Sequence, residues 1–111
     1  MTYIKMYDEH EFKQMLSFAP ISKVYRIWIL EGIEGKFKQY RIAYIVITES
    51  DDVFWTDYPT NYSGVGGRIF RGIEEALKAR NIKPIDLYMD RDLWLVFLFA
   101  LEEKSIPFGT F

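Results

Sequence analysis

The chain contains no cysteine and a single histidine. The missing cysteine excludes disulfides and thiolate metal sites, which fits a reducing compartment or a hot environment. The lone His10 has no second histidine to share a metal ion with, so we expect an ordinary exposed helix residue. No apolar run approaches the roughly 18 residues of a membrane span. No basic segment followed by an apolar one opens the chain, so we expect an intracellular, cytoplasmic protein without a membrane role.

Hydrophobic residues make up 50% of the 111 residues and aromatic residues 18%, which is enough for a real core. We expect a single domain over residues 1–111, with an N-terminal arm and helix at 1–20 and a core at 21–111. The formal net charge is −2. This slightly negative net charge argues against a protein whose main task is to coat nucleic acid, because such domains are usually basic.

Residues 22–50 carry the strongest local signal, two runs of β-branched and aromatic residues around a turn at Gly32–Gly35. This pattern predicts a β-hairpin. If Leu30 pairs with Phe37, Arg26 lies opposite Arg41, which is unfavourable. The pair then needs an acidic partner, an anionic ligand or a shifted register. Both faces of the hairpin are largely apolar, so we expect cover on both sides.

Helices are predicted around the hairpin by capping and periodicity. Asp8 and Glu11 have capping-box spacing, and Pro20 ends the helix that they begin. Apolar residues recur at helical spacing over 68–80. Short strands are expected at 53–56, 85–89 and 106–111, with a further strand or a packed arm at 2–7.

Residues 93–101 are all apolar, and we interpret segment 93–103 as a helix rather than a strand. Asp90 and Asp92 supply a cap before it, and Pro107 follows its acidic end. A helix that is apolar all round needs cover on several sides, which a small domain rarely provides. The segment therefore predicts a homodimer interface.

The predicted order from Ser22 onward is strand, strand, strand, helix, strand, helix. This α/β (α+β) order, an antiparallel three-stranded meander followed by helix-strand-helix, resembles the ribonuclease H-like fold. Short features support the resemblance: Leu30-Glu31-Gly32, Thr60-Asn61 before the main helix, and Met89-Asp90-Arg91. If residues 2–7 form a strand, the alternative is a ferredoxin-like βαββαβ fold.

The resemblance implies a site in which carboxylates from the first strand, the first helix and the fourth strand hold magnesium ions. By position, Glu31 and Asp90 would be two of these metal ligands. The helix carboxylate is missing, because Gly66, Gly67 and Arg68 occupy its place. We therefore assign no catalytic residue and expect no enzyme, and magnesium is a cofactor only if the protein is nuclease-like.

An anion-binding site is predicted where a glycine-rich segment enters a helix with exposed backbone amides. Its residues are Gly64, Gly66, Gly67, Arg68 and Arg71. For nucleic acid, Arg26, Trp28 and Arg41 of the hairpin would join them, with loop aromatics at 55, 58 and 62.

Two functions follow from these patterns. The first is a non-enzymatic interaction protein, a homodimer with a mixed sheet packed by helices, which also binds a protein partner. The alternative is a nucleic-acid-binding or vestigial metal-dependent nuclease domain of ribonuclease H-like type. The acidic balance, the missing helix carboxylate and the apolar segment 93–101 favour the first.

Overall fold

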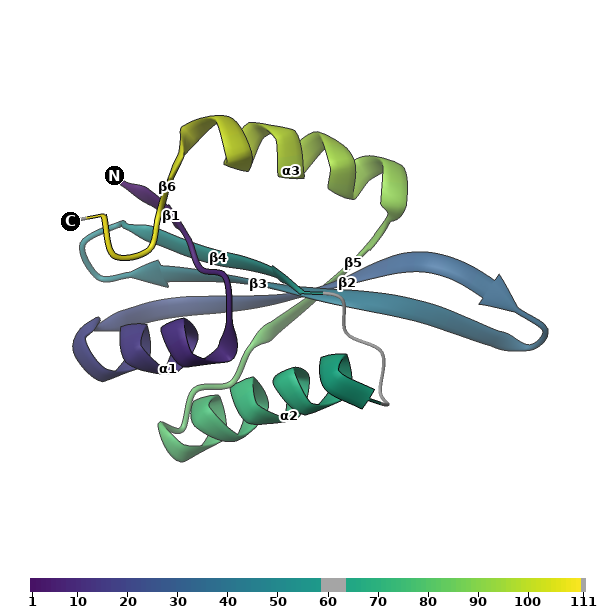
Figure 1. The fold of residues 1–111 in the computed structure, drawn as a ribbon, viewed down its shortest axis with the longest axis horizontal. Helices are drawn as coiled ribbons and strands as arrows, with labels where there is room; N and C mark the ends of the chain where they lie inside the picture. The colour runs from purple at the N-terminus through teal and green to yellow at the C-terminus, as the bar shows by residue number, and fades with distance from the viewer. Residues whose placement is uncertain (59–63, 111) are drawn as a thin grey trace.

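The computed structural model describes residues 1–58 and 64–110 and has a six-stranded mixed sheet with three helices in this part of the chain (Figure 1). The predicted α/β class is therefore confirmed. The order of elements differs from the ferredoxin-like alternative, which has fewer strands. The elements are β1 (Tyr3–Lys5), α1 (Glu9–Phe18), β2 (Ile21–Glu34), β3 (Phe37–Thr48), β4 (Val53–Tyr58), α2 (Gly64–Ala79), β5 (Ile85–Asp90), α3 (Arg91–Lys104) and β6 (Ser105–Pro107).

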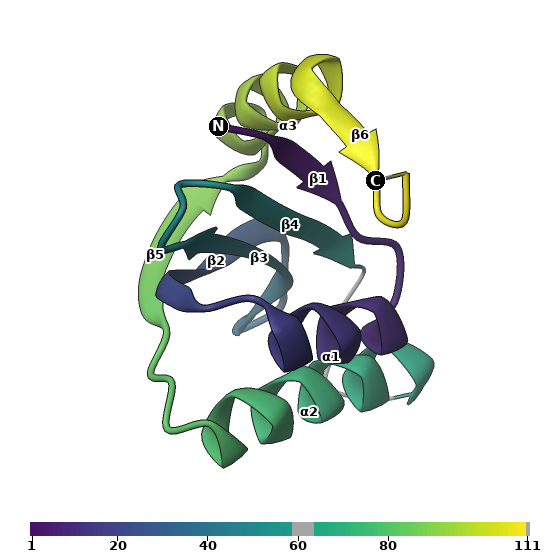
Figure 2. The same cartoon turned by 90° about the vertical axis from the view of Figure 1, so that its left-hand side faces the viewer.

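Helices lie on both faces of the sheet, as the two-sided apolar pattern of the hairpin predicted. α1 and α2 cover one face and α3 covers the other (Figure 2). The larger core lies beneath α1 and α2 and includes Phe12, Met15, Tyr44 and Ile73. The smaller core lies beneath α3, where Trp94 packs against β2 and β3.

The strand order in the sheet is β5-β2-β3-β4-β1-β6. β3 pairs antiparallel with β2 and β4, whereas β5 pairs parallel with β2, and β1 pairs parallel with β4 and β6. The N-terminal segment is thus an inner strand rather than a peripheral arm. The two edges of the sheet are β5 and β6.

The hairpin has a different register from the one that the sequence predicts. The turn is Gly35-Lys36, with Gly35 at a φ of 59°, rather than Gly32–Gly35. Leu30 pairs with Tyr40, and Arg26 pairs with Tyr44 instead of Arg41. An irregularity between Leu30 and Gly32 shifts the pairing, and a shift of one residue exchanges the faces of every side chain beyond it.

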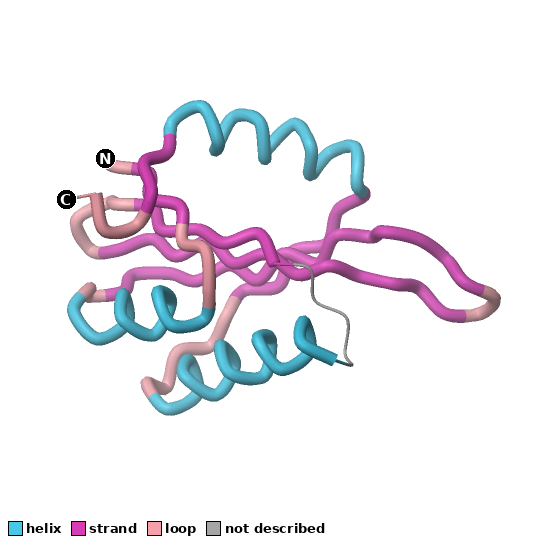
Figure 3. The backbone as a smooth tube through the Cα atoms, in the orientation of Figure 1, coloured by secondary structure: helices cyan, strands magenta, loops and turns pink. Residues whose placement is uncertain are grey.

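The far end of the hairpin projects beyond all three helices (Figure 3). Its tip exposes Ile33 and Phe37. Neither helix layer reaches this part of the ribbon, so backbone pairing between the two strands holds it together.

Helix starts follow the capping rules. Asp8 accepts a hydrogen bond from the Glu11 backbone N–H at 2.8 Å, and Asp90 accepts one from the Leu93 N–H at 2.8 Å. The prediction of a helix at 93–103 is confirmed by α3. α2 starts at Gly64, earlier than the periodicity indicated, because its first turn is glycine-rich and carries little apolar pattern. No helix in the described ranges has the length and apolarity needed to cross a bilayer.

Trp94 is the residue that anchors α3, since it is the one fully buried side chain of this helix. We expect Trp94→Ala to lower the free energy of unfolding by about 3–5 kcal/mol, through lost burial and the cavity left behind. Phe37→Ala is the matched control, since Phe37 is 78% exposed at the hairpin tip. Urea unfolding at low protein concentration measures the free energy of unfolding of both variants. Equal losses in Trp94→Ala and Phe37→Ala would contradict the anchoring role.

Candidate functional site

Arg26 lies at the centre of a charged cluster that joins three elements. From β2, its Nε and Nη2 donate to the two carboxylate oxygens of Asp86 on β5, at 2.6 and 3.0 Å. Its Nη1 donates to Glu74 on α2 at 2.6 Å. Both acids thus hold one guanidinium, and Asp86 does so in the bidentate geometry that strengthens such pairs. Arg26 therefore has an acidic partner, one of the three alternatives that the sequence left open, and the register is shifted as well.

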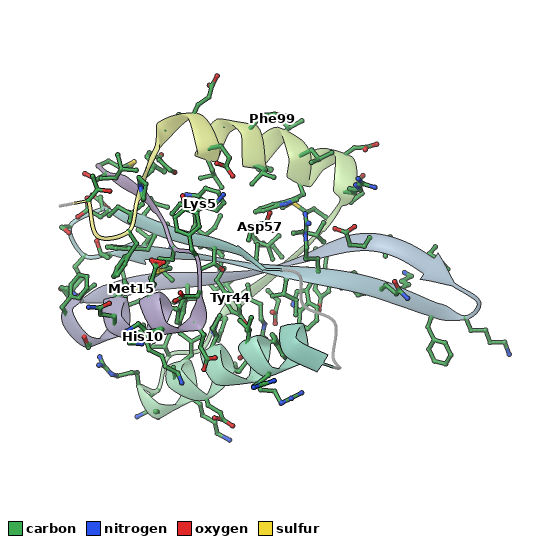
Figure 4. All side chains as sticks on the ribbon, viewed as in Figure 1. Lys5, His10, Met15, Tyr44, Asp57 and Phe99 are labelled. Carbon is green, nitrogen blue, oxygen red and sulfur yellow. The ribbon has the colours of Figure 1, made fainter. Side chains whose placement is uncertain are left out.

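Two further side chains complete the cluster. The Trp28 indole N–H donates to Asp86 at 2.8 Å, and the Tyr44 hydroxyl donates to Glu74 at 2.8 Å. Figure 4 shows Tyr44 between the sheet and the helices beneath it. Burial, together with the hydrogen bond to Glu74, raises the pKa of Tyr44. The Arg26 hydrogen bond lowers the pKa of the Asp86 carboxyl, and that bond raises the pKa of Arg26 in turn.

Next to this cluster, four rings form an aromatic surface: Trp28, Tyr40, Phe70 and Tyr88. Trp28 stacks on Tyr88 with centroids 6.0 Å apart and an interplanar angle of 13°. Tyr40 meets both rings edge-on, and Phe70 of α2 meets Trp28 edge-on. Tyr88 is 67% exposed, so one ring of the stack faces solvent.

The predicted anion site falls in the first turns of α2. Gly64, Gly66 and Gly67 begin the helix, and Arg68 and Arg71 are exposed. Within residues 1–58 and 64–110, neither arginine forms an ion pair with a carboxylate. The first turn of α2 has no acidic residue, so the positive charges there are uncompensated.

Of the proposed loop aromatics, Trp55 is the one whose side chain is described. Trp55 is fully buried in β4, where its indole N–H donates to the Ser105 hydroxyl at 2.7 Å. Tyr62 and the Thr60-Asn61 pair lie outside the described residues, and β4 continues to Tyr58. In the described ranges, an exposed aromatic stack lies around Trp28, and the sequence predicted only Trp28 of that group.

Arg41 lies on the opposite face of the sheet from Arg26, beneath α3. Its Nε is 3.2 Å from Glu31 and 3.4 Å from Asp57. Figure 4 shows Asp57 and Lys5 on this side of the sheet. Burial raises the pKa of Asp57, although Arg41 opposes that shift. The Arg41 Nε and an Asp57 oxygen are buried and attract each other as charges without a hydrogen bond.

Glu31 and Asp90, the two predicted metal ligands, line one shallow pocket of about 430 Å³ with Gly32, Arg91 and Asp92. Their carboxylates have other tasks, since Glu31 pairs with Arg41 and Asp90 caps α3. In the described ranges, no three His, Cys, Asp or Glu side chains gather closely enough to hold a metal ion. The metal role of this pair stays a prediction.

Four residues of this region were not predicted from the sequence: Glu74, Asp86, Tyr44 and Tyr88. Asp86 and Tyr88 alternate with apolar residues in β5, and this alternation was the available signal that one face of the strand is polar. That their partners are Arg26 and Trp28 depends on the parallel register of β5 on β2. The sequence contains no local signal for that register.

The pH dependence of stability tests the Asp86 contact. We expect Asp86→Asn to lower the free energy of unfolding by about 1–2 kcal/mol at neutral pH, because the bond is charge-assisted but partly exposed. The folded-state pKa of Asp86 lies below the unfolded value of about 3.9. The stabilisation is therefore full above that pH and is lost as the pH falls through the folded pKa.

Denaturant titrations of the parent and the variant between neutral and strongly acidic pH measure this difference. Glu75→Gln is the control, since Glu75 is exposed on the same helix as Glu74 and forms no ion pair with the described residues. A difference between parent and Asp86→Asn that persisted unchanged at the acid end would show that the effect is not electrostatic.

Comparison with known proteins adds no assignment: no family model, no curated protein and no solved structure matches this chain.

Proposed function

We propose that the protein is a non-enzymatic interaction module that functions as a homodimer. The observation that carries this proposal is the exposed apolar surface of α3. Val96 is 67% exposed and Phe99 is 72% exposed, and Leu93 and Phe97 are about half exposed. Figure 4 shows Phe99 on the side of α3 away from the sheet. A contiguous apolar surface of this kind marks an interaction site in a protein that folds in water.

The spacing of these residues suits a second helix or sheet edge. Leu93, Val96, Phe97 and Ala100 stand at i, i+3, i+4 and i+7, which places them in one stripe along the helix. The inward side of α3 is already used, since Trp94, Leu98 and Leu101 contact the sheet. The stripe is thus additional to what the fold of one chain needs.

The charged cluster supports a binding role over a catalytic one. Glu74 and Asp86 both pair with Arg26, so these acids are occupied by a fixed cation of the chain itself. The parallel pairing of β5 with β2, next to antiparallel β3 and β4, supports the ribonuclease H-like resemblance. Counted from Ser22, β2 is the first strand and β5 is the fourth. Arg26 of β2 thus lies between Glu74 of α2 and Asp86 of β5.

Light scattering tests self-association directly. We expect a mass of about twice 13.2 kDa at high micromolar concentration. Phe97→Glu should weaken the dimer at least tenfold, because it buries an unpaired charge in the interface. Ile33→Glu is the matched control, an exposed apolar residue at the hairpin tip that should leave the mass unchanged. A parent that stays monomeric at these concentrations would refute the proposal.

A second candidate function is nucleic-acid binding at the aromatic surface. The observation in its favour is that Phe70, which touches Trp28, belongs to the same early turns of α2 as the exposed Arg68 and Arg71. Stacking on an exposed ring such as Tyr88 and phosphate contacts from arginine are the two elements of single-strand recognition. Arg26 and Arg41 are held by their own acids and are weaker candidates for phosphate contacts.

Fluorescence anisotropy with a single-stranded oligonucleotide tests this candidate. We expect affinity to fall steeply with salt, and Arg68→Ala with Arg71→Ala to weaken binding several-fold without unfolding the protein. Lys13→Ala with Lys23→Ala removes the same charge elsewhere on the surface and is the control. No binding by the parent at low salt would exclude this role for the surface.

A further inference from the structure

The two edges of the sheet differ in how they are protected. β6 is a short strand of three residues that ends in Pro107, and such edges resist pairing with another chain. β5 has six residues and no proline. Of its two acidic side chains, Asp86 is held by Arg26, and Asp90 caps α3. In the described ranges no strand pairs with the outer side of β5, so its backbone is open to a partner.

Apolar side chains accompany this open edge. Ile85 and Leu87 are exposed to about 45% and 40%, and their register with Tyr25 and Ile27 places them on the α3 face of the sheet. Met89 continues the same row and packs against the core beneath α3. An apolar edge strand without proline or outward-pointing lysine is the type of edge that pairs with another strand.

α3 presents one flank toward this edge. It crosses the sheet from the end of β5 to the start of β6 (Figures 1 and 2). Glu102 pairs with Lys5 at the end of β1, and Lys104 lies over the ring of Tyr3 at its start. The flank of α3 that carries Lys104 therefore points toward the start of β1, and the flank that carries Glu102 points toward its end. At 100° per residue, Leu93 and Phe97 share the flank of Lys104. That flank faces the half of the sheet where β5 begins.

We propose, on the basis of the homodimer proposed above, that two copies pair through their β5 edges, antiparallel about a two-fold axis. The sheet then continues from one copy into the other. Leu93 and Phe97 of each copy cover the joined row of Ile85, Leu87 and Met89. The occupant of this surface is a second copy of the chain, because the row is complementary to itself under a two-fold axis.

Side-chain chemistry selects the register. When Leu87 lies on the two-fold axis, it meets its own counterpart, and Ile85 lies beside Met89 of the second copy. On the other face, Asp86 then lies beside Tyr88 of the second copy. The neighbouring register, centred on Tyr88, places Asp86 beside Asp90 of the second copy, and like charges directly opposite one another are unfavourable.

The available area is appropriate for a stable dimer. Ile85, Leu87, Leu93 and Phe97 are each exposed to about half, and Val96 to 67%. Together they offer on the order of 400 Å² of apolar surface. A standard interface buries about 800 Å² per partner, of which about 56–58% is non-polar. The open backbone of β5 and the charged side chains around it would supply the polar remainder.

Cysteine cross-linking tests the pairing without background, because the chain has no cysteine of its own. Residues directly opposite in antiparallel strands have Cα atoms about 4.5–5.5 Å apart, within disulfide range. We expect Leu87→Cys to give a covalent dimer under mild oxidation. Tyr88→Cys and Phe99→Cys should stay largely monomeric on a non-reducing gel, because neither side chain meets its counterpart.

Hydrogen exchange on the unmodified chain provides a second measurement that does not depend on a variant folding. We expect the β5 amides to become at least tenfold slower to exchange between low and high micromolar concentration. A dimer by light scattering without this protection, or with cross-links at Phe99→Cys instead of Leu87→Cys, would overturn the edge pairing and leave the homodimer intact. A cross-link at Tyr88→Cys alone would overturn the register. A monomeric parent would overturn both proposals.

Discussion

The pairing of β2 with β3 is the constraint on which the rest of the structure depends. Both faces of this hairpin are covered where it lies between the helices, so its register decides which side chains meet α2 and which meet α3. A slip of one residue would move Arg26 away from Glu74 and Asp86 and place it beneath α3. The irregularity between Leu30 and Gly32 and the turn at Gly35 set this register.

The two faces of the sheet serve different purposes. The face under α1 and α2 holds the larger core, and the Arg26 cluster ties β2, β5 and α2 together along one side of it. The face under α3 is covered by one helix with a single fully buried residue, Trp94. One helix therefore covers less of this face than two helices cover of the other. Apolar surface remains exposed on the same side of the sheet as the open β5 edge.

This asymmetry links the fold to the proposed function. The residues that stabilise one chain, such as Arg26 and Trp94, are distinct from those that we expect to join two chains, such as Leu87 and Phe97. Substitutions can therefore separate folding from association. The aromatic surface around Trp28 lies on the other face of the sheet from α3, so a ligand there and a second copy at β5 would contact different side chains.

The sequence alone determined the elements with strong local signals. Capping by Asp8 and Asp90, the β-rich runs around the hairpin and the apolar length of 93–101 are local, and they predicted the helices and strands with small errors at their ends. The functional geometry was decided by the tertiary structure. Arg26 could be paired with Glu74 and Asp86 only once the register of β2 and the parallel docking of β5 were known. These contacts join residues far apart in the chain, and register depends on the whole sheet rather than on any short segment.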